Sequence, residues 1–286
     1  MQGPLWSARL VREQPDLVRQ LHFDYFVSGA DIAITASYQA SFETYARHDI
    51  SVDEAVRLMS DSVALALQAR DTFWAAESNR KGRVKPLVAA SVGPYGAMLA
   101  AGSEYRGNYG LSQEDLMQFH RPRMKVLLAA GADLLACETI PCLDEALAIA
   151  RLLPEFPGAS AWISFSCRDG EHNCQGEQLA DCVARLDAFV QVVAVGVNCT
   201  PPEYISALVG AMQARTRKPI LVYPNSGEHF DSTHRQWQGC PSADHFARLA
   251  LDWHATGARM IGGCCRTTPA DIRAVRHILH DHLAAA

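Results

Sequence analysis

The sequence predicts an α/β fold built around parallel strands, and three observations support this prediction. Short β-branched or apolar runs alternate with longer helical patterns along the chain, as in βα units around a parallel sheet. A Gly-Ala pair precedes three of these runs, at residues 29–30, 131–132 and 257–258, and glycine is a common helix stop. No Ser/Gly-rich linker or charge block divides the 286 residues, so we expect one domain over residues 1–286.

Seven runs have the length and composition of strands. They are Ile32–Ala36, Leu87–Val92, Leu134–Glu138, Ala161–Phe165, Val193–Asn198, Ile220–Tyr223 and Arg259–Gly262. Helical patterns separate or follow them, at Ser51–Glu77, Gln113–Ala130, Cys142–Leu153, Leu179–Phe189, Glu203–Arg215, Ala243–Thr256 and Ala270–Leu283. Pro202 and Pro269 precede two of these helices, where proline fits the first turn.

The chain opens on a further helical pattern, Leu5–Val27. In a closed (β/α)8 barrel each helix follows a strand, and there are eight strands. Because the other seven units are regular, we expect a TIM-type (β/α)8 barrel whose first strand is absent from this chain. An open sheet is the alternative.

The composition argues against several classes of protein. The chain is 49% hydrophobic, and 26 basic against 31 acidic residues give a net charge of −5 without long charged runs. Disorder and electrostatic binding of nucleic acid are therefore disfavoured. Residues 1–9 lack the apolar stretch of a signal peptide, and no run approaches the roughly 18 apolar residues of a membrane span. We expect a cytoplasmic protein with no membrane or nucleic-acid partner, while its oligomeric state stays open.

The cysteines are the unusual feature of the composition. Nine occur, all from Cys137 onward, and an odd count in a chain of this length does not fit a small disulfide scaffold. Cys199 directly follows one predicted strand, and Cys264 and Cys265 follow another. The carboxyl ends of parallel barrel strands line one face, where active sites lie. If these are the sixth and eighth strands, they are roughly 10 Å apart, so the three sulfurs can converge on a metal.

Three thiolates with one open position are the catalytic pattern for zinc. The alternative is that the three are ordinary buried cysteines, since free cysteine is often buried. The adjacent pair Cys264-Cys265 favours a metal, because a disulfide between neighbours is strained and a strand does not point two consecutive residues inward. A phosphate-binding loop at Gly262-Gly263 is a weaker reading. The remaining cysteines show no comparable pattern and are expected to be bystanders: Cys137, Cys142, Cys167, Cys174, Cys182 and Cys240.

Residues Val195–Thr200 and Met260–Pro269 resemble the homocysteine S-methyltransferase family. Further family-like stretches fall in order at successive strand ends: residues 34–40, 91–96, 136–139 and 223–228. The resemblance is greatest to the single-domain branch that uses S-methylmethionine, and sometimes S-adenosylmethionine, as donor. Residues 91–96, 102–107 and 223–229 carry that closeness. It implies a (β/α)8 barrel in which Cys199, Cys264 and Cys265 hold zinc, with the sulfur of homocysteine in the fourth position.

The implied reaction is transfer of a methyl group from the sulfonium donor to homocysteine, forming methionine. A free thiol has a pKa near 8.5 and is mostly protonated at neutral pH, and zinc would hold it as the nucleophilic thiolate. The donor leaves as a neutral thioether, so we expect no catalytic residue beyond the metal site. The alternative is a non-catalytic zinc- or thiol-binding member, inactivated by loss of the first strand.

The resemblance also implies substrate-binding residues. Glu138 matches the glutamate that binds the amino group of homocysteine in the family, and a carboxylate suits an ammonium group. Asn198 either hydrogen-bonds near the zinc ligands or closes a turn. Aromatic faces attract sulfonium cations, so Tyr38, Tyr95 and Tyr223 are candidates for the donor pocket, and packing is the alternative role for each of them. Asn225 and Glu228 are further candidates.

Family members normally begin with a strand that ends in Asp-Gly-Gly or Asp-Gly-Ala, and its aspartate also contacts homocysteine. No such segment precedes Leu5. We therefore expect incomplete barrel closure and incomplete recognition of the amino group.

Overall fold

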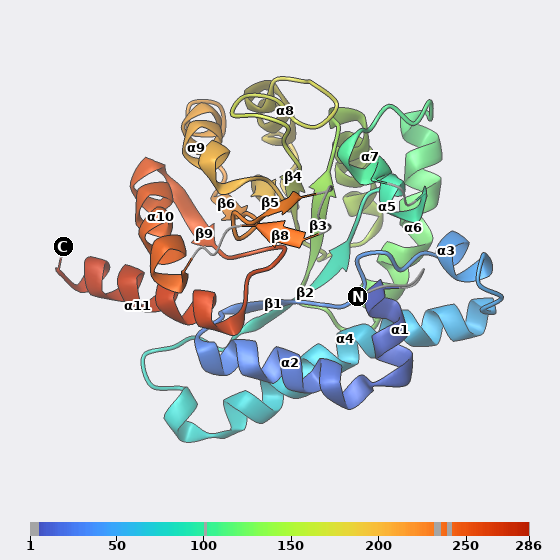
Figure 1. The fold of residues 1–286 in the computed structure, drawn as a ribbon. Coiled ribbons are helices and arrows are strands. Elements are labelled where there is room, and N and C mark those ends of the chain that lie inside the picture. The colour runs from blue at the N-terminus through green and yellow to red at the C-terminus, as the bar shows by residue number, and fades with distance from the viewer. Residues whose placement is uncertain (1–5, 100–101, 232–235, 239–241, 286) are drawn as a thin grey trace.

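The computed structural model of the chain describes residues 6–99, 102–231, 236–238 and 242–285. Most of the residue 1–9 segment analysed above lies outside these ranges. Seven parallel strands form one sheet in the order of the sequence: β1 (Ile32–Ile34), β2 (Leu87–Val92), β3 (Leu134–Ile140), β4 (Ala161–Phe165), β5 (Val192–Asn198), β6 (Ile220–Tyr223) and β9 (Ala258–Ile261). The sheet curls into a half-barrel with helices around its outside (Figure 1). All seven strands predicted from the sequence are confirmed, with ends displaced by two residues at most.

Helices alternate with the strands as predicted. They are α1 (Trp6–Glu13), α2 (Pro15–Ser28), α3 (Phe42–Ala46), α4 (Val52–Ala75), α5 (Tyr95–Leu99), α6 (Gln113–Ala129), α7 (Leu143–Leu152), α8 (Leu179–Leu186), α9 (Ile205–Gln213), α10 (Ala243–Thr256) and α11 (Pro269–Ala285). Serines cap four of them: the side chains of Ser41, Ser51, Ser112 and Ser242 each accept a hydrogen bond from the backbone three residues on, which satisfies a free N–H at the helix start.

The predicted helix Leu5–Val27 is two helices. Its described part divides into α1 and α2, with Gln14 between them in a non-helical conformation (φ −141°). Pro15 begins α2, and proline disfavours helical backbone in the residue before it. The proline was visible in the sequence, and the single helix was wrong for that reason.

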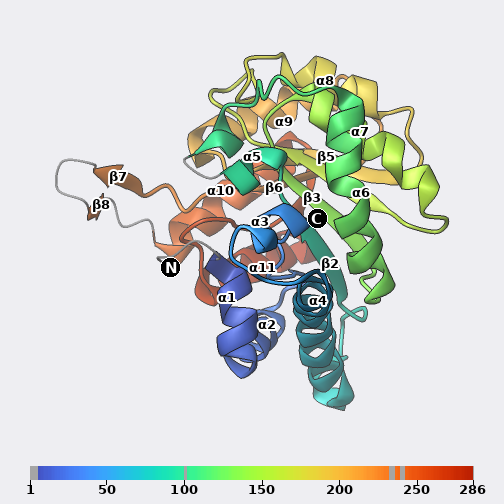
Figure 2. The ribbon, with the colours of Figure 1, turned by 90° about the vertical axis from the view of Figure 1, so that its right-hand side faces the viewer.

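The structure also contains a short antiparallel hairpin that was not predicted from the sequence. β7 (His229–Asp231) pairs with β8 (Gln236–Gln238), and it extends away from the body of the molecule between β6 and α10 (Figure 2). Each strand has only three residues, which is too short for an alternating pattern to be read.

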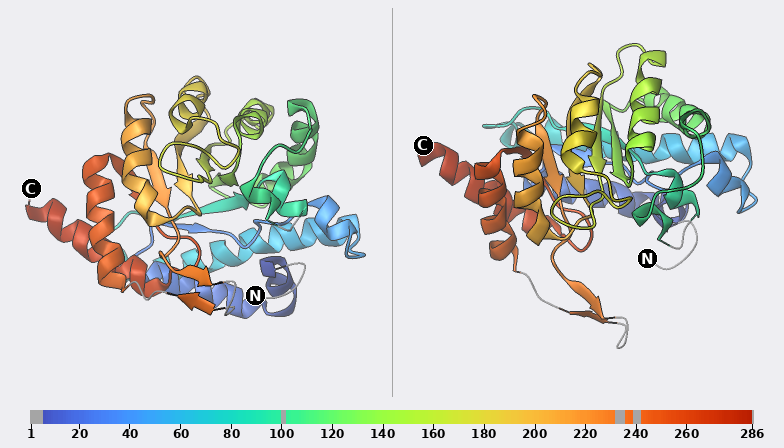
Figure 3. Two further views of the ribbon diagram at one scale, coloured as in Figure 1. Left: turned by 45° about the horizontal axis from the view of Figure 1, so that its top comes forward. Right: turned by 90° about the horizontal axis from the view of Figure 1, so that it is seen from above.

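The core has an inner and an outer part. Inside the curl, inward side chains from successive strands pack together: Ala89, Leu134, Ala136, Trp162, Ala194, Leu221 and Tyr223. Ile32 of β1 and Met260 of β9 also join this inner cluster. A larger outer core fills the space between the sheet and the surrounding helices, whose arrangement is seen in Figure 3.

The helical layer closes where the sheet does not. Among the described strands, β1 pairs only with β2 and β9 only with β6, so they form a half-barrel rather than a closed ring. Helices α2 and α11 nevertheless meet: Arg276 of α11 donates to the backbone oxygen of Gly29 at 3.0 Å, and Tyr25 of α2 donates to that of Thr267 at 3.2 Å. Gly29 ends α2 in the left-handed conformation (φ 111°).

None of the helices in the described ranges is long and apolar enough to cross a membrane.

A candidate metal centre beside a buried polar network

Three cysteines converge at the carboxyl ends of β5 and β9. The Sγ atoms of Cys199, Cys264 and Cys265 lie within 4.8 Å of one another. The Cys264–Cys199 sulfur distance is 3.0 Å and the Cys199–Cys265 distance is 3.4 Å. Cys199 and Cys264 are half-buried and Cys265 is exposed, so the cluster opens toward solvent. The convergence predicted from the sequence is therefore present.

Backbone hydrogen bonds between three loops hold this cluster together. The N–H of Cys199 donates to Tyr223 at 3.2 Å, and that of Cys264 donates to Pro224 at 2.8 Å. Ser226 donates in turn to the backbone oxygen of Cys265 at 3.0 Å. Cys199 itself has φ 50°, a left-handed conformation that is uncommon for a residue other than glycine and concentrates at functional sites. The loop after β6 thus links the two loops that carry the cysteines.

Hydrogen bonds among the three thiols shift the pKa values of Cys264 and Cys265 in opposite directions. Hydrogen bonds from Cys199 and Cys264 lower the pKa of Cys265 to about 3. The hydrogen bonds of Cys264 with Cys199 and Cys265 raise the pKa of Cys264 well above that of a free thiol. One negative charge is therefore easily held by the protein alone, and a cation is needed to hold all three sulfurs as thiolates.

The cluster fits a tetrahedral metal site. With metal–sulfur bonds of about 2.3 Å, tetrahedral geometry places sulfurs about 3.8 Å apart. The observed separations of 3.0 and 3.4 Å need to widen by less than 1 Å, and the three sulfurs leave one coordination position open. The cluster could therefore hold a metal.

Glu138 lies in β3, two residues before the strand ends, and is 8% exposed. Burial raises the pKa of its carboxyl to about 7, although hydrogen bonds from Ser91 and Tyr223 act in the opposite direction. Ser91 donates to its Oε1 from the end of β2. The hydroxyl of Tyr223 also lies 2.6 Å from Ser164 Oγ and accepts from Trp162 at 3.0 Å. Glu138 is thus a buried acid held in a fixed position.

Asn198 connects this network to the strand end that carries Cys199. Its Oδ1 accepts from the backbone of Thr139 at 2.7 Å and from Ser164 at 2.8 Å, and its Nδ2 donates to Thr139 Oγ1 at 2.8 Å. Thr139 has φ 60°, and the register between β3 and β4 shifts around it. The fully buried amide therefore fixes the irregular backbone next to Glu138.

Tyr38 and Asn225 lie at the edges of the same region. Burial raises the pKa of Tyr38, as does the nearby charge of Cys199, and its hydroxyl is hydrogen-bonded to Thr139. The backbone oxygen of Tyr38 accepts from Gly93 at 3.1 Å, and a Cβ at Gly93 would lie 2.6 Å from that oxygen. The Oδ1 atom of Asn225 is buried and has no partner, which leaves an acceptor available to a ligand.

The remaining residues singled out in the sequence, Tyr95, Glu228 and the cysteines outside the cluster, make the following contacts. Tyr95 packs against Tyr109 and Phe119 with ring centroids 5.3 and 5.0 Å apart. Glu228 pairs with Arg266, next to Cys265, at 2.5 Å. Of the bystander cysteines, four are buried and Cys174 is half-buried, while Cys240 lies outside the described residues.

Sequence reasoning did not assign several residues that the structure brings to the site. These are Ser91, Trp162, Ser164, Thr139 and Tyr105. Tyr105 donates from its hydroxyl to Cys199 Sγ at 3.3 Å. Thr139 and Tyr105 lie in stretches already marked as family-like, whereas Trp162 and Ser164 carried no signal beyond their position in a strand.

Comparisons with known proteins agree with this geometry. A family model described as homocysteine S-methyltransferase matches residues 1–279. Homocysteine S-methyltransferase YbgG of Bacillus subtilis is 55% identical over 271 residues, which cover 95% of this chain and 86% of the relative. Homocysteine S-methyltransferase of Escherichia coli is 49% identical over 275 residues, covering 95% of this chain and 87% of the relative.

The fold matches solved structures as well. The metallated form of the Escherichia coli homocysteine methyltransferase MmuM superposes with a TM-score of 0.87 at 46% identity, covering 97% of this chain and 89% of that one. Its apo form superposes with a TM-score of 0.77 at 42% identity, covering 95% and 88%. A similar protein with this fold has thus been crystallised with metal.

Proposed function

Because the chain belongs to the homocysteine S-methyltransferase family, we propose that it transfers a methyl group from S-methylmethionine to the thiol of homocysteine, forming methionine. S-adenosylmethionine is the second donor of this proposal. The observation that carries it is the convergence of three cysteine sulfurs within 4.8 Å at the same strand ends as the buried carboxylate of Glu138.

The metal of this proposal is zinc, held by Cys199, Cys264 and Cys265. When bound, it would take the homocysteine sulfur in its fourth position and keep it deprotonated, which supplies the nucleophile. The donor set supports zinc, because three thiolates with one open position are typical of catalytic zinc sites.

The amino-acid part of homocysteine is recognised by side chains of the polar network. Glu138 binds the ammonium group, and the unpartnered Oδ1 of Asn225 accepts a second hydrogen bond from it. Asn198 contributes by holding Thr139 and the end of β3 in place, since its amide is engaged with Thr139 and Ser164. These contacts orient homocysteine so that its sulfur faces the donor methyl group.

Tyr38 faces the sulfonium donor, whose positive charge is attracted by an aromatic ring. Displacement of the methyl group converts the sulfonium into a neutral thioether. The leaving group needs no proton, so the reaction uses no general acid from the protein.

We further propose that residues 1–286 act as one homocysteine-binding domain of the (β/α)8 type. An eighth strand would lie between the free edges of β1 and β9. The contacts between α11 and α2 support this position, because they bring the two ends of the helical layer together. Reduced thiols are required at the site, and all eight described cysteines are unpaired. A reducing compartment such as the cytoplasm therefore suits the reaction.

The test uses the reduced, zinc-loaded protein with homocysteine and one donor at a time. We expect one zinc per chain, and methionine formation that is fastest with S-methylmethionine and slower with S-adenosylmethionine. Chromatography measures the methionine, and betaine serves as a donor that lacks a sulfonium. Zinc retention without methionine from either sulfonium donor would instead support a non-catalytic zinc-binding protein.

A further inference from the structure

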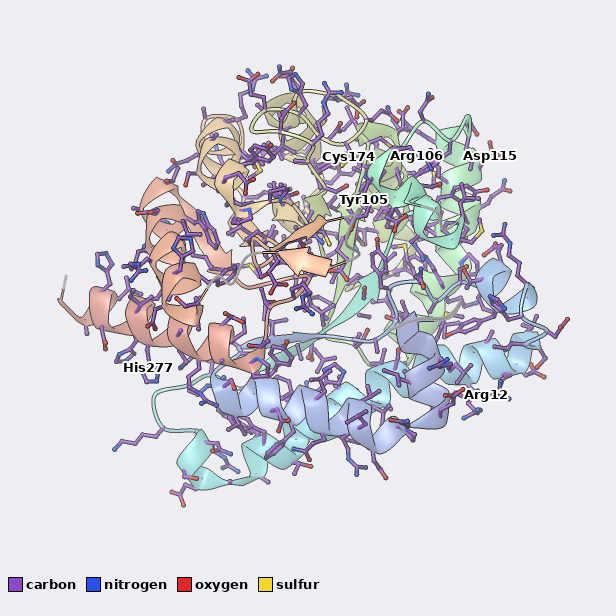
Figure 4. All side chains as sticks on the ribbon, viewed as in Figure 1. Arg12, Tyr105, Arg106, Asp115, Cys174 and His277 are labelled. Carbon is purple, nitrogen blue, oxygen red and sulfur yellow. The ribbon has the colours of Figure 1, made fainter. Side chains whose placement is uncertain are left out.

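A tyrosine from a separate segment reaches the cysteine cluster. Tyr105 ends a short 3₁₀ turn, Ser103–Tyr105, between α5 and α6. Its hydroxyl donates to Cys199 Sγ at 3.3 Å, although the residue as a whole is 42% exposed. Figure 4 labels Tyr105 near the centre of the view, where this connection approaches the strands. The function proposed above gives Tyr105 no role.

The segment around Tyr105 is anchored on both sides. Before it, the backbone oxygen of Glu104 accepts from Ser166 Oγ at 3.5 Å. After it, the backbone N–H of Asn108 donates to Gln175 Oε1 at 2.6 Å. Both anchors lie in the connection between β4 and α8. The Tyr105 hydroxyl is therefore held on Cys199 from a fixed backbone.

The proposed reaction creates a problem of selectivity at this position. A sulfonium donor can methylate any accessible thiolate, and Cys199 is a thiolate whenever it holds a metal. Such a transfer would break the bond between the donor sulfur and its methyl carbon, form a bond from Cys199 Sγ to that carbon, and release a neutral thioether. Cys199 would become S-methylcysteine, which has no negative charge to bind a cation. A donated hydrogen bond stabilises the charge on a thiolate and lowers its nucleophilicity.

We propose that Tyr105 is a positioning residue that holds Cys199 and protects its thiolate from methylation, so that the methyl group passes to homocysteine. This inference rests on the proposed function for the identity of the competing nucleophile. The protection itself depends only on the hydrogen bond between Tyr105 and Cys199.

The experiment compares Tyr105→Phe with Tyr109→Phe in zinc-loaded protein. Tyr109 is a matched control from the same segment, because its hydroxyl donates to the backbone oxygen of Ser103. Methyl iodide serves as a donor that needs no binding site, and peptide mass spectrometry measures methylation at each cysteine of the cluster. We expect Cys199 to be methylated about fivefold faster in Tyr105→Phe than in the unmodified protein, with Tyr109→Phe unchanged.

The rate at Cys264 separates protection from general loosening. If Cys264 and Cys199 gain equally in Tyr105→Phe, the variant has opened the cluster, and the proposal is overturned. Equal rates at Cys199 in all three proteins overturn it as well. Failure of the unmodified protein to form methionine would refute the proposed function instead, and the methyl iodide assay would still decide the role of Tyr105.

Discussion

The cysteine cluster and the Glu138 network lie at the same strand ends but are built differently. The cluster is half-buried to exposed, and backbone hydrogen bonds between loops hold it. The network is buried, and side chains from successive strands hold it. Asn198 uses its whole amide on Thr139 and Ser164. The cluster needs a cation to charge its three sulfurs, whereas Glu138 can carry its charge from neutral pH upward without one.

This difference suits the two tasks that we propose for these regions, metal binding and recognition of an ammonium group. A metal ligand must remain reachable by the ion and by the incoming thiol, so the loops leave it open. A carboxylate that recognises an ammonium group gains strength from a site with little water, so the strands bury it. The two regions should therefore respond differently to substitution.

The largest effect is expected at the cysteine cluster. Cys264→Ala removes one of three ligands, so we expect loss of zinc and a decrease in methionine formation of at least about a thousandfold. Circular dichroism should change little, because Cys264 is only half-buried, at the edge of the inner core. Cys174→Ala is the matched control at a half-buried cysteine away from the cluster, and it should retain zinc and activity. Unfolding of Cys264→Ala would show that the cluster is structural.

Glu138→Gln should affect homocysteine binding rather than zinc. Loss of a charged hydrogen bond to the ammonium group should raise the KM for homocysteine by about ten- to a hundredfold, with zinc content unchanged. Steady-state kinetics and metal analysis measure the two. Glu145→Gln changes another fully buried carboxyl whose pKa is also raised to about 7, and it should leave the KM for homocysteine near its normal value. A normal KM in Glu138→Gln would contradict the assignment.

The pH dependence tests the same carboxyl. Burial raises the pKa of Glu138 to about 7, and only the charged form binds an ammonium group. The KM for homocysteine should therefore rise as the pH falls from about 8 to 6, and Glu138→Gln should lack this dependence. Between pH 4.5 and 7 the carboxyl of Glu138 is protonated in the folded protein and ionised in the unfolded chain. The free energy of unfolding that this group contributes therefore decreases as the pH rises through that window.

Asn198→Ala is expected to act through stability. It leaves the Thr139 N–H without its acceptor and removes one of the two partners of the Ser164 hydroxyl, at a cost of about 2 kcal/mol. The denaturation midpoint should fall, and the KM for homocysteine should rise less than in Glu138→Gln. Asn198→Asp retains the acceptor oxygen and should recover part of the loss. Full stability in the alanine variant would show that water replaces the amide.

The smallest effect is expected at the rim of the cluster. Glu228→Gln weakens an ion pair with Arg266, whose side chain is half exposed, and exposed ion pairs contribute little to stability. The melting temperature should hardly change, and zinc should dissociate only slightly faster in competition with a chelator. A large loss of zinc would mean that this pair, rather than the backbone hydrogen bonds, holds the Cys264-Cys265 loop.

The strands were predictable because parallel βα units leave a strong local pattern, and the cysteine cluster because both its parts directly follow strands. The link between Trp162, Ser164 and Tyr223 was not, since it depends on the register of three strands that no local pattern reveals. Tyr105 was missed for a related reason. It lies in the connection between α5 and α6, 94 residues before Cys199, and only the folded chain brings the two together. The division at Pro15 could have been read from the sequence.

The meeting of α11 with α2 has a consequence for synthesis on the ribosome. The chain emerges from its N-terminus, so the C-terminal end of α2, where Gly29 accepts from Arg276, stays uncovered until α11 is made. Two of the three cluster cysteines, Cys264 and Cys265, emerge 65 residues or more after Cys199. A nascent chain therefore cannot assemble its full set of metal ligands, and load them, before residue 265 has left the ribosome.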